Sequence, residues 1–243
     1  MSELNTSGWL EALELERQLP DQAAEPQPPN DCDPARRSFL RRAAGVAGVV
    51  GVVGAGVLTA SKADASEANP GLTARAFRDI RRHENSHVLA LLNVLGANAR
   101  TKPTFMNLAQ PNIRKFLLVS QALENTGVGA YLGALPAVNG KAVISAAGSI
   151  ALIEARHAGW LNSLVNAHIT TNLFGQEQNF ERPFTISQVV NSASPFIASL
   201  NGGPPLTFSS TPSDSNDIAI LNFALALEFL EAEFYNINVP KFY

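Results

Sequence analysis

Residues 150–160 read Ile-Ala-Leu-Ile-Glu-Ala-Arg-His-Ala-Gly-Trp and place Glu154 three residues before His157. Three residues is nearly one turn of an α-helix, so both side chains project from the same face and can bind one metal ion. The surrounding residues are mostly apolar, which favours a buried face over an exposed one. A second copy of the pattern occurs at Glu84 and His87, in a chain with only 4 histidines. The repeated pattern predicts a metal site between two helices, to which further helices would add carboxylates.

The composition is that of a soluble globular protein, with 46% hydrophobic and 16% charged residues and a formal net charge of −3. Because there is no surplus of basic residues, nothing points to nucleic acid as a partner. The single cysteine, Cys32, precedes the region that we expect to fold as a domain. This position excludes disulfides and thiolate catalysis from that domain.

Residues 1–65 have the features of a targeting segment rather than of a folded domain. A polar leader rich in proline precedes Arg36-Arg37-Ser38-Phe39-Leu40, an apolar stretch at 43–60 and a small-residue site at Ala63-Asp-Ala65. The twin arginines look like a twin-arginine export signal, so we expect a periplasmic or extracellular protein that meets the membrane only through this signal. The alternative is an uncleaved N-terminal membrane anchor, although the apolar stretch is short and rich in Gly and Ala.

Residues 66–243 are enough for one domain with a sizeable core, and their apolar periodicity predicts an all-α fold. The expected long helices lie at about 73–97, 112–134, 141–168 and 215–237. A loop-rich segment at about 170–214 separates the last two helices and is expected to pack as a small subdomain. The last helix is apolar on nearly every face before Glu228, which is typical of the central helix of a bundle.

Each expected helix carries one glutamate in an apolar setting. Burying a single unpaired carboxylate costs several kcal/mol, so a compensating charge is required. Four carboxylates and two neutral imidazoles sum to −4, which two divalent cations neutralise. A glutamate from each of two helices and Glu-x-x-His from each of the other two form the ligand set of a dinuclear site in a four-helix bundle. Oxygen and imidazole ligands suit iron or manganese, so we expect two Fe or Mn ions as the cofactor. The predicted ligands are Glu84, His87, Glu124, Glu154, His157 and Glu228.

Other interpretations of the first pair remain open. Glu84 and His87 could lie on the exposed face of an amphipathic helix, beside Arg81 and Arg82. His83 and His87 are four residues apart and could bind zinc, but they lack the glutamate of the metalloprotease arrangement.

The other expected ligands have alternatives too. Glu154 could form a surface pair with Arg156, and Glu124 could simply precede a helix break. Glu231 lies one turn after Glu228 and is the alternative ligand on the last helix. Glu233 is expected to be solvated and His168 to be structural near a helix end.

A family resemblance is carried by residues 123–134, 153–157, 183–198 and 221–235. The last of these reads Leu-Asn-Phe-Ala-Leu-Ala-Leu-Glu-Phe-Leu-Glu-Ala-Glu-Phe-Tyr. Together they are similar to the ferritin-like proteins that include plant desiccation-related proteins and exported bacterial relatives. The resemblance spans about residues 73–237 and implies a ferritin-like antiparallel four-helix bundle.

The resemblance also implies roles for residues of the last helix. Glu228 matches the single glutamate of the family's first helix, and Tyr235 follows seven residues later, as in ferritins. Tyr131 and Tyr235 could be core residues with a bonded hydroxyl, or they could donate to a ligand or relay an electron. Because the family's first helix stands last here, the resemblance implies a circular permutation, with residues 170–214 as the new connection.

The expected function is redox chemistry on Fe(II), oxygen or peroxide in stress protection, with carboxylates that bridge the ions. The alternative is a non-catalytic desiccation- or stress-related structural protein, in which metal only neutralises buried charge. A third interpretation, hydroxylation of the oxygenase type, would need a substrate pocket.

Overall fold

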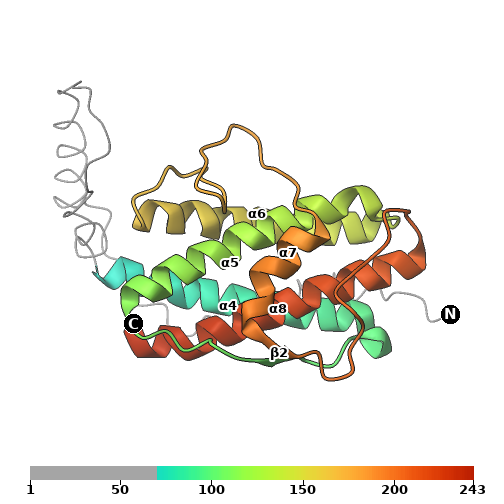
Figure 1. Ribbon diagram of the computed structural model, residues 1–243, viewed down its shortest axis with the longest axis horizontal. Helices are drawn as coiled ribbons and strands as arrows, with labels where there is room; N and C mark the ends of the chain where they lie inside the picture. The colour runs from blue at the N-terminus through green and yellow to red at the C-terminus, as the bar shows by residue number, and fades with distance from the viewer. Residues whose placement is uncertain (1–69) are drawn as a thin grey trace, which may run out of the picture. The chain divides into compact units, whose positions relative to one another are not determined.

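A computed structural model describes residues 70–243, most of which lie in four long helices. These helices pack side by side as a bundle, which confirms the all-α fold (Figure 1). They are α4 (Pro70–Leu95), α5 (Ile113–Ala134), α6 (Lys141–Leu164) and α8 (Asp214–Phe242). The expected leader and export signal lie outside the described residues. Within residues 70–243, no helix combines the length and the apolar character needed to cross a membrane.

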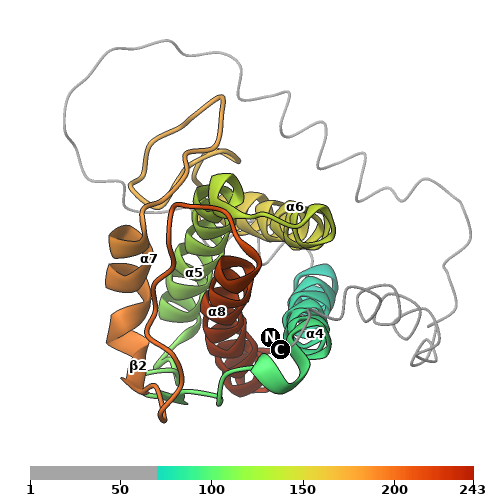
Figure 2. The same cartoon turned by 90° about the vertical axis from the view of Figure 1, so that its right-hand side faces the viewer.

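Two helices of the bundle run in each direction. In Figure 1, α4 and α5 run one way along the bundle, and α6 and α8 run the other way. The connection from α4 to α5 therefore returns along the length of the bundle, and it contains η1 (Gly96–Asn98) and strand β1 (Thr104–Phe105). Seen end on in Figure 2, the four long helices surround a common centre, so each turns one face inward.

Local chemistry sets the ends of the helices. Asn112 caps α5 by accepting a hydrogen bond from the backbone N–H of Lys115, and Ser213 caps α8 through its hydroxyl. The helix α4 begins at Pro70, which suits a first helical turn. The helix α6 ends at Leu164, four residues before the expected end, because Asn166 has a φ of 60°. This left-handed conformation cannot continue a right-handed helix.

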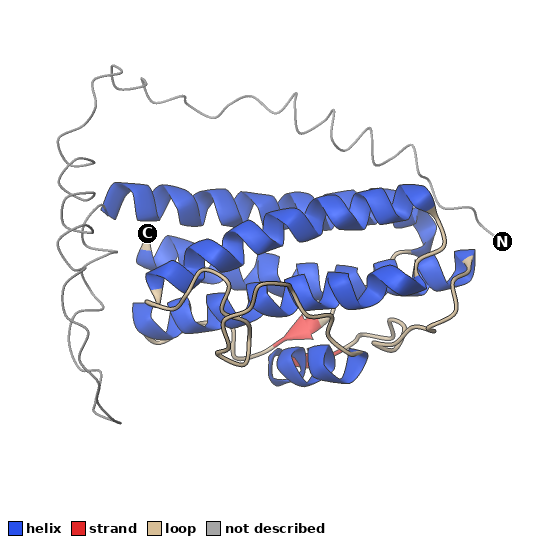
Figure 3. Cartoon of the chain, turned by 90° about the horizontal axis from the view of Figure 1, so that it is seen from above, coloured by secondary structure: helices blue, strands red, loops and turns tan. Residues whose placement is uncertain are grey.

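The connection between α6 and α8 packs on the outside of the bundle. It contains α7 (Ile186–Ala193), η3 (Ser194–Phe196) and β2 (Ile197–Ser199). A capping box between Thr185 and Gln188 starts α7. Strand β2 pairs antiparallel with β1, so the two long connections of the fold are joined by backbone hydrogen bonds. Figure 3 shows α7 and the strand pair on the same side of the bundle.

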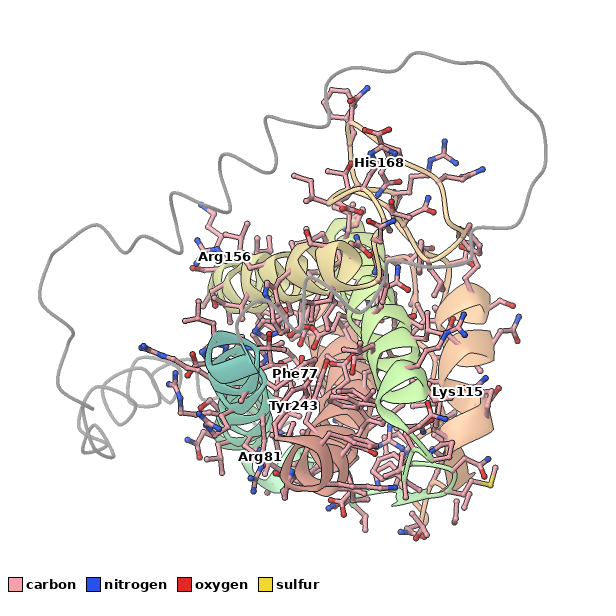
Figure 4. The ribbon with its side chains drawn as sticks, turned by 90° about the vertical axis from the view of Figure 1, so that its left-hand side faces the viewer. Phe77, Arg81, Lys115, Arg156, His168 and Tyr243 are labelled. Atoms are coloured by element: carbon pink, nitrogen blue, oxygen red, sulfur yellow. The ribbon has the colours of Figure 1, made fainter. Side chains whose placement is uncertain are left out.

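Two apolar clusters fill the interior and leave a polar layer between them. On α4, Phe77 and Ile80 belong to one cluster, and Leu91 and Leu95 belong to the other. Glu84 lies between these positions along the helix. In the first cluster the rings of Phe77 and Tyr243 stack with centroids 4.7 Å apart, between α4 and the end of α8 (Figure 4). The middle of the bundle is therefore closed to water at one end by aromatic packing.

Two glycines let the outer connection approach α5. The backbone N–H of Phe184 donates to the carbonyl oxygen of Gly129 at 2.9 Å. A Cβ atom at Gly129 would overlap the ring of Phe184, and one at Gly133 would overlap its backbone oxygen. The segment that leads into α7 therefore docks on α5 only because these two positions lack a side chain.

Replacing Gly133 by alanine should destabilise the fold by about 1–3 kcal/mol, because the new methyl group must displace the backbone of Phe184. Gly148→Ala is the matched control, since nothing lies within 4 Å of a Cβ atom at that helical position. It should stabilise the protein by up to about 1 kcal/mol. Thermal unfolding followed by circular dichroism measures both changes. Equal stability of the two variants would contradict the proposed docking.

Candidate metal centre

The six residues chosen from their spacing lie together in the polar layer of the bundle. Their side chains are buried, with exposed fractions from 0% for Glu84 to 9% for His87. Their ligand atoms form two groups, each within 4.8 Å, and Glu84 and Glu154 belong to both. Glu124 and His157 complete one group, and His87 and Glu228 complete the other. Two cations held in these groups would be bridged by the shared carboxylates.

Several carboxylate oxygens converge on each imidazole. The Nδ1 atom of His87 lies 3.2 Å from Glu84, 3.1 Å from Glu154 and 3.3 Å from Glu228. The Nδ1 atom of His157 lies 3.1 Å from Glu84 and 3.0 Å from Glu124. An imidazole nitrogen carries at most one proton and can donate only one hydrogen bond of good geometry.

Four buried carboxylate oxygens accordingly accept no hydrogen bond from any described residue. They are Oε1 of Glu84, both oxygens of Glu154 and Oε2 of Glu228. Three of them, Oε1 of Glu84, Oε1 of Glu154 and Oε2 of Glu228, lie within 3.3 Å of an imidazole nitrogen without a hydrogen bond, so proximity alone does not satisfy them. Buried oxygens without a donor are costly, and a bound cation would satisfy them. The donor set therefore suits iron or manganese.

Two tyrosines bond two of the other carboxylate oxygens, and His87 and His157 bond Oε2 of Glu84 and Oε2 of Glu124. The hydroxyl of Tyr131 donates to Oε1 of Glu228 at 2.6 Å, and that of Tyr235 donates to Oε1 of Glu124 at 2.5 Å. Each tyrosine lies seven residues after the glutamate of its own helix and bonds the glutamate of the other helix. Burial and the nearby glutamates raise the pKa of both hydroxyls, so both remain protonated donors.

Crowding of like charges shifts the pKa values of the centre. Burial lowers the pKa of His157, but the attraction of Glu124 and Glu84 outweighs it and raises the pKa to about 11. Burial raises the pKa of Glu84, yet the two histidines lower it to about 2. Burial and the charges of Glu84 and Glu124 raise the pKa of Glu154 well above its usual value. In the metal-free centre, protons on His157 and Glu154 therefore reduce the net negative charge and the repulsion among the carboxylates.

Glu231 is a fifth buried glutamate, with 3% of its surface exposed, but it belongs to neither ligand group. A Cβ atom at Gly127 would lie 3.1 Å from Oε2 of Glu154 and 3.6 Å from Oε1 of Glu231. The glycine therefore makes room for both carboxylates. Burial and the charge of Glu154 raise the pKa of Glu231 well above its usual value. On α8, Glu228 belongs to a candidate ligand group and Glu231 does not.

The structure also shows the positions of three residues for which the sequence suggested a surface or structural role. Glu154 is fully buried, whereas Arg156 lies on the outer side of α6 (Figure 4). Glu233 forms a surface ion pair with Lys102 at 2.6 Å. His168 lies in the loop outside the bundle with 72% of its side chain exposed, because α6 ends before it.

His83 has a contact that its sequence position does not reveal. Its Nδ1 atom lies 2.9 Å from Nε2 of His157, on the side of that ring opposite to the carboxylates. Burial, His157 and Arg82 lower the pKa of His83 to about 4. The ring is therefore neutral near pH 7 and can accept a hydrogen bond. The sequence suggested His83 and His87 as a possible zinc-binding pair, and it gave no sign of the contact between His83 and His157.

Comparison with known families gives one result. A family model described as a ferritin-like domain matches residues 37–167, more than half of the chain. The match includes α4, α5 and α6 and ends before α8. Comparisons with curated proteins and with solved structures gave no match.

Glu154→Gln should stabilise the metal-free protein at pH 7 by about 1–3 kcal/mol. A carboxyl whose pKa is raised by folding stabilises the fold at low pH, and this contribution is lost as the pH rises above the ordinary value of 4.5. The amide avoids that loss, but it removes a shared ligand, so Mn(II) should no longer raise the melting temperature. Thermal unfolding with EDTA and with Mn(II) measures both effects.

Glu233→Gln is the control, because this carboxylate pairs with Lys102 at the surface. It should change stability by less than about 0.5 kcal/mol and leave the effect of Mn(II) intact. A Glu154→Gln protein that is less stable in EDTA and still stabilised by Mn(II) would argue against a repulsive, metal-binding centre.

Binding of Mn(II) should release protons and strengthen as the pH rises from 6 to 8. With its pKa raised to about 11, the His157 ring is doubly protonated and positively charged throughout this range. A metal ion binds only the neutral ring, so binding displaces one proton. Each proton displaced changes the apparent affinity by about tenfold per pH unit. Calorimetric titrations in buffers of different ionisation enthalpy count the protons. A pH-independent affinity would rule out His157 as a ligand.

Proposed function

The chain belongs to the ferritin-like domain family, and we propose that it is a metalloprotein with a carboxylate-bridged centre of two iron or manganese ions. The observation that carries this proposal is the pair of overlapping Glu/His groups, whose buried oxygens lack hydrogen-bond donors. Four carboxylates and two neutral imidazoles would balance two divalent cations, which makes the loaded centre neutral in a dry interior.

Each ligand has a distinct place in the proposed centre. Glu84 and Glu154 would bridge the two ions, because both belong to each group. Tyr131 and Tyr235 fix one oxygen of Glu228 and one of Glu124. The other oxygen of each would face an ion, once a cation replaces the proton between Nδ1 of His157 and Oε2 of Glu124. Bound iron or manganese would supply the one-electron redox chemistry that these side chains lack.

The proposed reaction is the oxidation of Fe(II) by peroxide or oxygen. Two substrate Fe(II) ions lose one electron each, and hydrogen peroxide takes up both electrons and two protons and leaves as two water molecules. With dioxygen as the oxidant, the same electrons and protons yield hydrogen peroxide. A small apolar cavity of about 20 Å³ has room for one water-sized molecule. It lies between α5 and α8 and is lined by Tyr131, whose hydroxyl bonds Glu228.

Two finer proposals concern the context of the centre. We propose export through the twin-arginine-type signal within residues 1–65 and a role in stress or desiccation protection, on the basis of the sequence motifs and the family resemblance. We also propose that the helix order is a circular permutation, with α8 in the place of the family's first helix. This is supported by the position of Glu228, which shares a ligand group with His87 although α8 lies outside the family match.

A non-catalytic stress protein is the second candidate function. It is favoured by the pKa shifts of His157 and Glu154, because protons on these groups can hold the carboxylates together without a metal. In that case the folded bundle itself would have the protective role, without catalysis. A bound cation would only add stability.

Metal analysis and turnover separate the two candidates. Anaerobically loaded protein should hold about two ions per chain, and it should oxidise Fe(II) with consumption of peroxide or oxygen. Glu124→Gln and Glu228→Gln should each lower both quantities, because each residue completes one of the two ligand groups. Glu233→Gln should change neither.

The outcomes assign the function. Two bound ions without turnover would favour the structural candidate over the redox enzyme. If Glu228→Gln left binding intact while Glu124→Gln abolished it, α8 would not supply a ligand, and the proposed permutation would lose its support.

A further inference from the structure

The two halves of the centre follow the same pattern. Glu84 and His87 on α4 correspond to Glu154 and His157 on α6, with the same spacing and the same Nδ1 atoms facing the carboxylates. The hydrogen bonds of the two tyrosines are likewise reciprocal between α5 and α8. A residue at one position of α4 can therefore be compared with the residue at the matching position of α6.

One matching pair differs in chemistry. The residue before Glu84 is His83, and the residue before Glu154 is Ile153, and both are half-buried. His83 lies against the outer nitrogen of His157, with Nδ1 to Nε2 at 2.9 Å. By contrast, no residue in the described part of the chain bonds Nε2 of His87. Only one of the two imidazoles is thus held from outside the centre.

The geometry between His83 and His157 is that of an in-plane hydrogen bond. The ring planes differ by 4° and the centroids are 5.2 Å apart. A ring radius of about 1.1 Å on each side plus the 2.9 Å contact accounts for this separation, so the rings lie edge to edge in one plane and are not stacked face to face. When Nδ1 of His157 binds a cation, its proton lies on Nε2 and faces Nδ1 of His83. His83 accepts this proton in the tautomer that carries its own proton on Nε2, and in that tautomer the 3.3 Å contact of Nε2 with the Arg82 guanidinium is not a hydrogen bond. The bond from His157 to His83 fixes both the tautomer and the orientation of the ligand ring.

We propose that His83 is a positioning residue that makes the two cation positions unequal: the position with His157 binds its ion more tightly and fills first, and the position with His87 exchanges its ion. The proposal rests on the dinuclear centre inferred above. A ring that is already oriented loses less freedom when it binds, and outer partners of ligand histidines are typically worth about 10–100-fold in metal affinity. The exchangeable position includes Glu228, whose tyrosine partner lines the small apolar cavity.

Titration of metal-free, full-length protein with Mn(II) tests the proposal, with free Mn(II) measured by electron paramagnetic resonance. Wild-type protein should bind two ions in separate steps. His83→Phe keeps a planar ring but removes the acceptor, so it should weaken the first step by about 10–100-fold and leave the second unchanged. His83→Asn keeps an acceptor close to the position of Nδ1 and should restore the separate steps. His168→Phe, in the exposed loop, should behave as wild type.

The reciprocal variant makes the test independent of any loss of folding. Ile153→His gives His87 the outer partner that it lacks, so it should strengthen the second step and bring the two affinities together. Melting temperatures in EDTA establish that the His83 variants remain folded, and Co(II) absorption reports the geometry of the occupied position.

Two outcomes distinguish the failure of this inference from the failure of the proposed function. If wild-type protein binds no Mn(II), the dinuclear centre is wrong and this inference falls with it. If wild-type protein binds two ions with equal affinity, or if His83→Phe weakens both steps alike, the inference is overturned and the centre stands.

Discussion

Repulsion among five buried glutamates is the constraint on which the middle of this bundle depends. Glu84, Glu124, Glu154, Glu228 and Glu231 occupy one layer between two apolar clusters, where water cannot screen their charges. Two imidazoles and two tyrosine hydroxyls offset part of the repulsion, and several oxygens still lack a donor. A pair of bound cations, as we propose, would satisfy the whole set and would account for so many buried charges in the interior.

Reciprocity between helices ties the centre to the fold. The tyrosine of α5 bonds the glutamate of α8, and the tyrosine of α8 bonds the glutamate of α5. These two helices must therefore keep a fixed register, although a long connection separates α8 from the rest of the bundle. The docking of Phe184 against Gly129 and the pairing of β1 with β2 hold that connection against the bundle. The outer segment thus contributes to the geometry of a centre that it does not contact through any ligand.

Much of the fold and of the candidate centre could be predicted from local patterns. Helical periodicity located the long helices, and the spacing of Glu154 and His157 selected residues that the structure brings together. Local patterns did not predict that α6 ends at Leu164. The helix ends because Asn166 adopts a left-handed conformation, which asparagine adopts at only a minority of its positions. Local patterns also did not reveal the contact of His83 with His157, since helical spacing relates residues only along one helix.

The sequence by itself determined which residues are available: periodic apolar positions, four helices and glutamates set among hydrophobic neighbours. Only the tertiary structure decided which oxygen meets which nitrogen, because these contacts join helices that are far apart in the chain. It distinguished Glu228 from Glu231, which the sequence left as alternatives, by bringing Glu228 and His87 into one ligand group. It also separated two histidines with the same local motif, because the packing of α4 against α6 gives His157 an outer partner and leaves His87 without one among the described residues. Such differences arise from distances across the bundle, which no spacing along the chain encodes.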